Sequence, residues 1–137
     1  MGQQQLLLIV LSVIIVGIAV VVGINMFNDQ AASSNLDAVT ADLVNLASRS
    51  QQHFRRPSAM GGGGGSFALL TANAAGLAYL TTQPTNENGV YAIQSAGTGT
   101  TVTIRGLGNE DGDGNGTVCT ADVQVWADSI AVTVLDR

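Results

Sequence analysis

The hydrophobic positions of this chain follow three successive patterns, and the first is an uninterrupted apolar run. Residues 6–24 read LLLIVLSVIIVGIAVVVGI, in which fifteen of the nineteen residues are Leu, Ile or Val and none is charged. At about 1.5 Å of rise per residue, a helix of this length roughly spans the hydrocarbon core of a bilayer. Membrane insertion of its aliphatic residues is favourable by about 4 to 9 kcal/mol. We therefore expect a helix that is surrounded by an apolar environment and not by water.

The second pattern begins after the apolar run, where hydrophobic residues recur at steps of three and four from Phe27 to Phe54 with charged residues between them. This spacing is typical of an amphipathic helix. The helix should end where Arg56 precedes Pro57 and a glycine run at 61–65 follows. The sequence thus predicts one rod of about 80 Å that runs from about residue 3 to about residue 55.

This predicted rod makes up the first domain, residues 1–56, with an apolar half at 1–28 and an amphipathic half at 29–56. Within the apolar half, Gly17 and Gly23 bracket three consecutive valines, which is poor local helix chemistry at roughly 0.5 to 1 kcal/mol per residue. Two interpretations stay open. The glycines permit close packing of helices, or the helix loosens between them within a protein assembly.

The third pattern has a period of two and starts near residue 90. Residues 57–66 are expected to be a flexible, glycine-rich connector, and residues 66–80 have helix-like apolar spacing weakened by Gly76. Alternation then predicts strands at 90–95, 101–105 and 117–126 and a fourth that contains Ile130, Val132 and Val134. Together, residues 67–137 should form a four-stranded antiparallel sheet domain with simple hairpin connections.

Such a sheet has one apolar face, and the amphipathic half of the rod is the element available to cover it. The predicted fold class is therefore α+β, with a long N-terminal helix packed on a small antiparallel sheet. The helix residues expected to contact the sheet are Val39, Leu43, Leu46 and Phe54.

Charge and cysteine content narrow the functional classes. Only 11% of the residues are charged, lysine is absent, and the net charge is −5, which argues against a nucleic-acid-binding surface. A surface with so few charges suits a protein that is covered by copies of itself. Cys119 is the only cysteine, so an intramolecular disulfide and a thiolate metal cluster are both excluded, and we expect a small buried residue.

An N-terminus that opens directly into an uncharged helix, continues as an amphipathic half and is followed by a small sheet resembles the type IV pilin family. The resemblance lies in residues 1–24 and in the layout behind them. It implies a subunit that sits in the inner membrane and is then polymerised by a pilus assembly machinery. It also implies a basic leader, absent here, that a prepilin peptidase removes, and N-methylation of Met1. The filament core is then expected to contain Met1, Gln5, Leu6, Leu7, Leu8, Leu11, Ile14, Ile15, Gly17, Ile18, Val21, Val22, Gly23, Ile24 and Phe27.

Three features depart from that family. Its members usually carry a fifth-position glutamate that is thought to neutralise the N-terminal amine of a neighbouring subunit, whereas Gln5 retains hydrogen bonding without the charge. The family's frequent proline near the end of the apolar segment is absent, with Gly17 and Gly23 as possible substitutes. The usual C-terminal disulfide cannot form with Cys119 alone.

The stretch at 111–122 has the spacing that opens a calcium-binding loop, because Asp111, Asp113 and Asn115 alternate and Asp122 stands at the twelfth position. Oxygen ligands at alternating positions can surround one calcium ion. The alternative is a plain hairpin loop, since Asp, Asn and Gly are also ordinary turn residues. Asn115 also begins an Asn-Gly-Thr glycosylation sequon.

No arrangement of residues points to catalysis. His53 is the only histidine and has no nucleophile at a recognisable spacing, so we expect a solvated helix residue. Arg49, Arg55 and Arg56 form a basic patch that the helix dipole and subunit contacts explain more simply than DNA binding.

The sequence therefore favours a structural subunit, not an enzyme, that polymerises with identical copies into a filament at the cell surface. That filament would serve attachment, motility or uptake. One alternative is the pseudopilin of a secretion system. Another is a monomeric, single-pass anchored binding module, with calcium as its candidate ligand.

Overall fold

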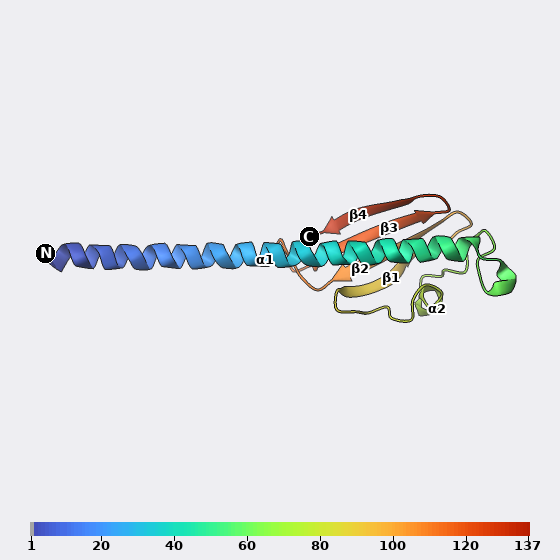
Figure 1. Cartoon of the computed structure of the whole chain (residues 1–137), viewed down its shortest axis with the longest axis horizontal. Helices are drawn as coiled ribbons and strands as arrows, with labels where there is room; N and C mark the ends of the chain where they lie inside the picture. Colours follow the sequence, from blue (N-terminus) through green and yellow to red (C-terminus); the bar gives the residue numbers. More distant parts are fainter. Residues whose placement is uncertain (1) are drawn as a thin grey trace.

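The computed structural model describes residues 2–137 and has two parts, a long helix and a four-stranded antiparallel sheet that packs along its C-terminal half (Figure 1). The strand order is β1-β2-β3-β4, so each strand pairs with its neighbour in sequence. The predicted α+β fold is confirmed, and its shape is compatible with that of a pilin. The elements are α1 (Gly2–Arg55), a 3₁₀ turn (Ser58–Met60), α2 (Ala74–Leu77), β1 (Gly89–Ser95), β2 (Thr101–Gly108), β3 (Thr120–Trp126) and β4 (Ile130–Asp136).

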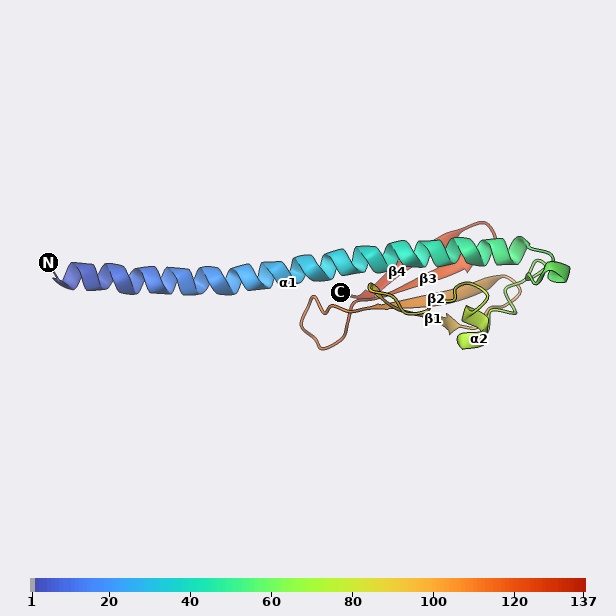
Figure 2. The same ribbon diagram turned by 60° about the horizontal axis from the view of Figure 1, so that its bottom comes forward.

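α1 is a single unbroken helix of 54 residues, within one residue of the predicted bounds at either end. Its first half projects beyond the sheet, and its second half lies across it (Figures 1 and 2). The change from an all-apolar to an amphipathic sequence therefore coincides with the point where the sheet domain begins to cover the helix.

The core lies between the second half of α1 and one face of the sheet. Val39 and Leu43 are completely buried, Leu46 is nearly so, and they meet the buried side chains of β2 and β3. Phe54 is partly buried, and its ring centroid lies 4.7 Å from that of Phe67. The opposite face of the sheet carries the Arg105–Asp122 ion pair at 2.7 Å.

The glycine run closes the end of α1, whereas the sequence predicted a flexible connector. Gly64 and Gly65 have φ values of +59° and +88°, in the left-handed region that favours glycine. This conformation turns the run back on the helix and satisfies carbonyls that a helix end leaves without partners. The backbone hydrogen bonds run from Gly63 to His53 (2.8 Å), from Gly64 to Arg56 (2.9 Å) and from Gly65 to Phe54 (2.7 Å).

The helix-like spacing at 66–80 produces only the four residues of α2. The amide of Phe67 donates to Thr98 (2.9 Å), and the carbonyl of Leu70 accepts from Gly97 (2.8 Å), so this backbone is bonded to a distant loop. Both side chains are buried in the core. The spacing thus reflected contact with the core and not a helical turn.

Two polar residues of α1 fix the position of the sheet domain along the helix, and the first is Asn35. Its amide donates to the carbonyl of Asn88 (2.8 Å), while its oxygen accepts from the backbone of Asn109 (2.8 Å) and from the Cys119 thiol (3.0 Å). Cys119 is fully buried, as predicted, and burial raises the pKa of its thiol.

Asp42 is the second residue of this kind. Partial burial acts to raise its pKa, but three donated hydrogen bonds outweigh that effect and hold the pKa below its ordinary value. Its Oδ2 accepts from Asn86 Nδ2 (2.9 Å), Asn88 Nδ2 (2.9 Å) and Tyr91 Oη (2.6 Å). The carboxylate therefore joins α1 to β1 and to the loop that precedes it.

The prediction for His53 was wrong, because its side chain is 5% exposed. Its ring lies 5.2 Å from that of Tyr79, and its Nε2 has no hydrogen-bond partner within residues 2–137. Burial and the nearby charge of Arg56 lower the pKa of the imidazole. Tyr79 and the folded-back glycine run supply the cover, and both are distant from His53 in the helical pattern.

Replacing Asp42 with Ala should lower the free energy of unfolding by about 1 to 3 kcal/mol, because three donors lose their acceptor. Unfolding by urea in detergent, followed through the fluorescence of Trp126, measures this change. Asp37→Ala is the matched control, since Asp37 is exposed on the same helix, and should change stability by less than ~0.5 kcal/mol. Equal losses in both variants would contradict the role given to Asp42.

The lowered pKa of His53 predicts that stability falls as the solution is acidified. The unfolded chain binds a proton below about pH 6.5, whereas the folded chain resists protonation until its lower pKa is reached. Stability is therefore fully present above about pH 6.5 and declines below it. Urea unfolding at two pH values on either side of that point tests this, and His53→Leu should remove the difference. A difference that persists in the variant would assign the effect to another group.

Candidate assembly surface

The apolar half of α1 is uncovered around its whole circumference. Each of the fifteen Leu, Ile and Val side chains in residues 6–24 is 49–69% exposed. Together they expose on the order of 1,500 Å² of apolar surface, several times the few hundred Å² of the largest patch on a typical soluble monomer. Such a surface requires an apolar environment outside the chain itself.

This segment can enter an apolar environment without leaving a polar group unsatisfied. Its backbone is helical throughout, and its one hydroxyl, on Ser12, donates to the carbonyl of Leu8 at 2.7 Å. The mean hydropathy reaches 3.3 over eighteen residues. The helix is therefore long and apolar enough to cross a membrane, where every backbone group must find its partner within the segment.

Both glycines of the segment lie on open surface. The helix continues through Gly17 and Gly23, so it does not loosen between them in the single chain. A Cβ atom at either position would meet nothing within 4 Å. These are consequently two places where the backbone of another helix can approach closely.

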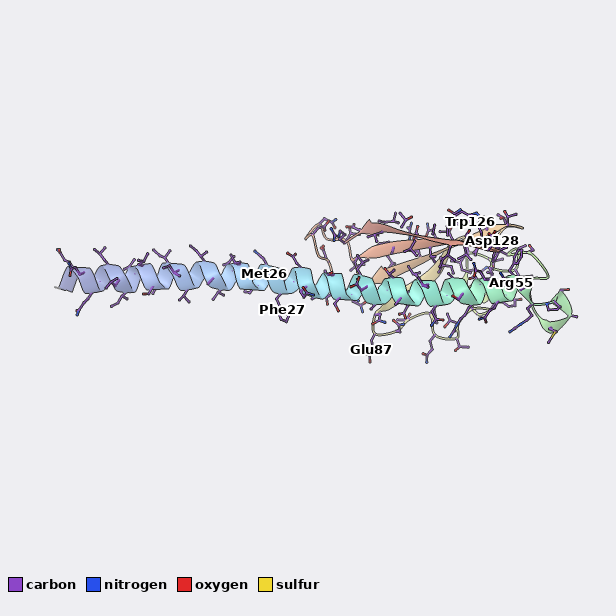
Figure 3. All side chains as sticks on the ribbon, turned by 45° about the horizontal axis from the view of Figure 1, so that its top comes forward. Met26, Phe27, Arg55, Glu87, Trp126 and Asp128 are labelled. Atoms are coloured by element: carbon purple, nitrogen blue, oxygen red, sulfur yellow. The ribbon has the colours of Figure 1, made fainter. Side chains whose placement is uncertain are left out.

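Other predicted core residues lie at the two ends of this segment. Gln5 is exposed near the start of α1, and Met1 lies outside the residues that the structure describes. Phe27 is 77% exposed, and the neighbouring Met26 is 67% exposed, just before the sheet domain begins (Figure 3). The side chains of Gln5, Met26 and Phe27 project from one continuous helix, so one copy cannot bring them together.

The four predicted calcium ligands are not assembled. Asp122 lies on β3, where both of its carboxylate oxygens accept from Arg105 at 2.7 and 2.8 Å. In the loop, the two oxygens of Asp111 accept from the amides of Gly116 (2.7 Å) and Gly114 (2.8 Å), which lower the pKa of this carboxyl. Within residues 2–137, no three acidic, His or Cys side chains are grouped to hold a metal. Calcium binding by the remaining loop residues stays a prediction.

Two of the three arginines of the predicted basic patch make contacts within the chain. Arg49 donates to the carbonyl of Leu80 (2.9 Å), and Arg55 donates to that of Ala127 (3.2 Å). Figure 3 shows Arg55 close to the turn that carries Asp128. These two side chains attach the helix end to the sheet domain, a use that the sequence pattern did not reveal.

A second uncovered apolar surface lies on β4, on the apolar face that the sequence predicted the helix would cover. Ile130, Val132 and Val134 are 38%, 37% and 45% exposed, although their β3 partners are completely buried. α1 packs mainly on β2 and β3 and leaves β4 largely uncovered. The period-two pattern of β4 indicates which face of the strand is apolar. It does not indicate how many strands of the sheet α1 covers.

Comparisons of the chain with protein families, with curated proteins and with solved structures found no match. Its function is therefore inferred from its own residues and their geometry.

The exposed apolar segment should hold the full chain in lipid vesicles through an alkaline wash. Replacing both Ile14 and Val21 with Asp adds about 5 to 7 kcal/mol to the insertion free energy, which offsets most of the favourable 4 to 9 kcal/mol. The double variant should appear in the supernatant after centrifugation. Ile14→Ala with Val21→Ala is the control and should remain with the vesicles. Retention of the double Asp variant would mean that another part of the chain holds the membrane.

Proposed function

We propose that this chain is a structural subunit that polymerises through residues 6–24 into an extracellular, type IV pilus-like filament. The observation that carries the proposal is a continuous helix that is apolar on every side over residues 6–24 and is covered by nothing else within residues 2–137. Its work is assembly and not catalysis.

The complete apolar circumference supports burial among several copies. A helix that packs against one partner needs only a stripe of apolar residues, whereas a helix inside a bundle is surrounded on all sides. Here successive side chains point about 100° apart around the helix axis, and the aliphatic ones that cover a full turn are all exposed: Leu7, Leu8, Ile9 and Val10. The same surface suits lipid before assembly, so one segment can serve two successive apolar environments.

The boundary behind the segment favours a subunit over a permanent anchor. Membrane helices are commonly flanked by Lys, Arg, Trp or Tyr, which hold the helix end at the headgroup level. Residues 25–48 contain none of these, and the first charge after the apolar run is Asp29. A helix with no such flank on this side can be withdrawn from the bilayer at lower cost.

The continuity of α1 links assembly to display. Because no break separates the apolar half from the half that packs on the sheet, bundling the first halves holds each sheet domain beyond the end of its own apolar half (Figure 2). A filament built in this way has helices at its centre and sheet domains outside. The pseudopilin alternative shares this geometry, and the length of the filaments separates the two.

Electron microscopy of the fraction sheared from the surface of producing cells tests the proposal. We expect filaments in which mass spectrometry finds this chain. Detection of the chain only in detergent-extracted membranes would contradict the proposal and favour the anchored module.

Val21→Asp separates filament formation from membrane residence. One Asp costs about 2.5 to 3.5 kcal/mol in the membrane, which the remaining aliphatic residues still exceed in most of the range. A carboxylate buried among other helices has no partner there, so filaments should be lost while the chain stays in the membrane. Val21→Ala should keep its filaments. Filaments of normal abundance in Val21→Asp would show that this residue is not in the core.

A further inference from the structure

The apolar strip on β4, formed by Ile130, Val132 and Val134, belongs to the face of the sheet that α1 packs on. Each strip residue stands opposite a buried residue of β3, with Val132 facing Val123 in the register. Facing residues of an antiparallel pair point to the same side of the sheet. The strip is thus a continuation of the core that the helix does not cover.

β4 is also an open edge of the sheet. Beyond its ladder with β3, its residues 130–136 make no backbone hydrogen bond to the rest of the described chain. Exposed edges are usually blunted by Lys, by Pro or by a covering loop, and β4 contains neither residue type. Its sole charge is Asp136 at the end of the strand. The β4 edge therefore lacks the features that usually prevent contacts with another chain.

The opposite edge of the sheet carries an apolar groove between α2 and β1, with a volume of about 490 Å³. None of the residues that line it is charged, and Leu77, Ala78, Pro84 and Ile93 supply much of its wall. The outer backbone of β1 is engaged in its first half, because the amide of Tyr91 donates to Pro84 at 2.8 Å and the carbonyl of Gly89 accepts from Asn86 at 3.0 Å. The groove is therefore a surface for apolar side chains.

We propose that the β4 strip of one copy docks into the α2–β1 groove of the next copy in the filament. The two surfaces lie on opposite sides of the sheet domain (Figure 1), and both are apolar and uncharged. A contact between two different patches continues from copy to copy, whereas a contact of one patch with itself ends at a dimer. This inference rests on the proposed filament and names a lateral contact between its sheet domains.

The size of the contact explains why it works within a filament. The strip exposes on the order of 200 Å², well below the ~800 Å² per partner of a stable free complex. It cannot hold two free copies together. Once the helices are bundled, however, neighbouring sheet domains are held at high effective concentration, and a small contact is sufficient to fix their orientation.

Cysteine cross-linking in filaments of the full chain tests the contact. Val132→Cys and Ala78→Cys are made singly and together, both at exposed positions, and sheared filaments are treated with a short bismaleimide. The double variant should give a ladder of covalent oligomers, because each copy is linked to two neighbours, while each single variant should give none. The natural chain is the control, since its Cys119 is completely buried.

The outcomes separate this contact from the filament itself. Filaments without a ladder in the double variant would overturn the contact and leave the proposed function standing. Dimers from Val132→Cys alone would replace it with a two-fold pairing of β4 strands. If the natural chain forms no filaments, the proposed function fails and the contact with it.

A charge substitution provides a second readout. Val132→Glu places a carboxylate on the strip, and its filaments should break into shorter pieces than those of the natural chain under the same shear. Thr133→Glu is the matched control, because Thr133 is the next residue on β4, is exposed and points to the opposite face. Equal lengths for the two variants would overturn the docking of the strip.

Discussion

Continuous backbone hydrogen bonding along α1 joins two surfaces that require different environments into one unbroken helix. Residues 6–24 require an apolar environment outside the chain, whereas Val39, Leu43 and Leu46 are satisfied by the sheet of the same chain. The helix that connects these two surfaces is not interrupted at Gly17 or at Gly23. Whatever surrounds the first half therefore also determines where the sheet domain is held, and this coupling is what makes a helical bundle with displayed domains physically reasonable.

The attachment of the sheet domain depends on a few polar contacts as well as on its thin core. Asn35 and Asp42 stand two turns apart on α1, and each binds several groups of the sheet domain. Because buried polar groups are costly when unpaired, these contacts favour one register over its neighbours.

The two uncovered apolar surfaces have the same physical origin. A domain of this size has one helix with which to cover a four-stranded sheet, and α1 spans only its middle strands. β4 is left out, just as the first half of α1 is left without a partner. Few charges are available to make either surface soluble, since only 11% of residues are charged. Both surfaces call for partners outside the chain, and identical copies supply both under the proposed function.

The sequence by itself determined the elements: the length of α1, the change in its character near residue 28, and the four strands and their order, because periodicity records which side of an element is apolar. Only the tertiary structure decided what covers each side. It buried His53 beneath distant residues, turned the glycine run into a helix cap, bonded residues 67–70 to a remote loop and left β4 exposed. Those outcomes depend on which segments meet in space, and local spacing holds no information about partners that are far away along the chain.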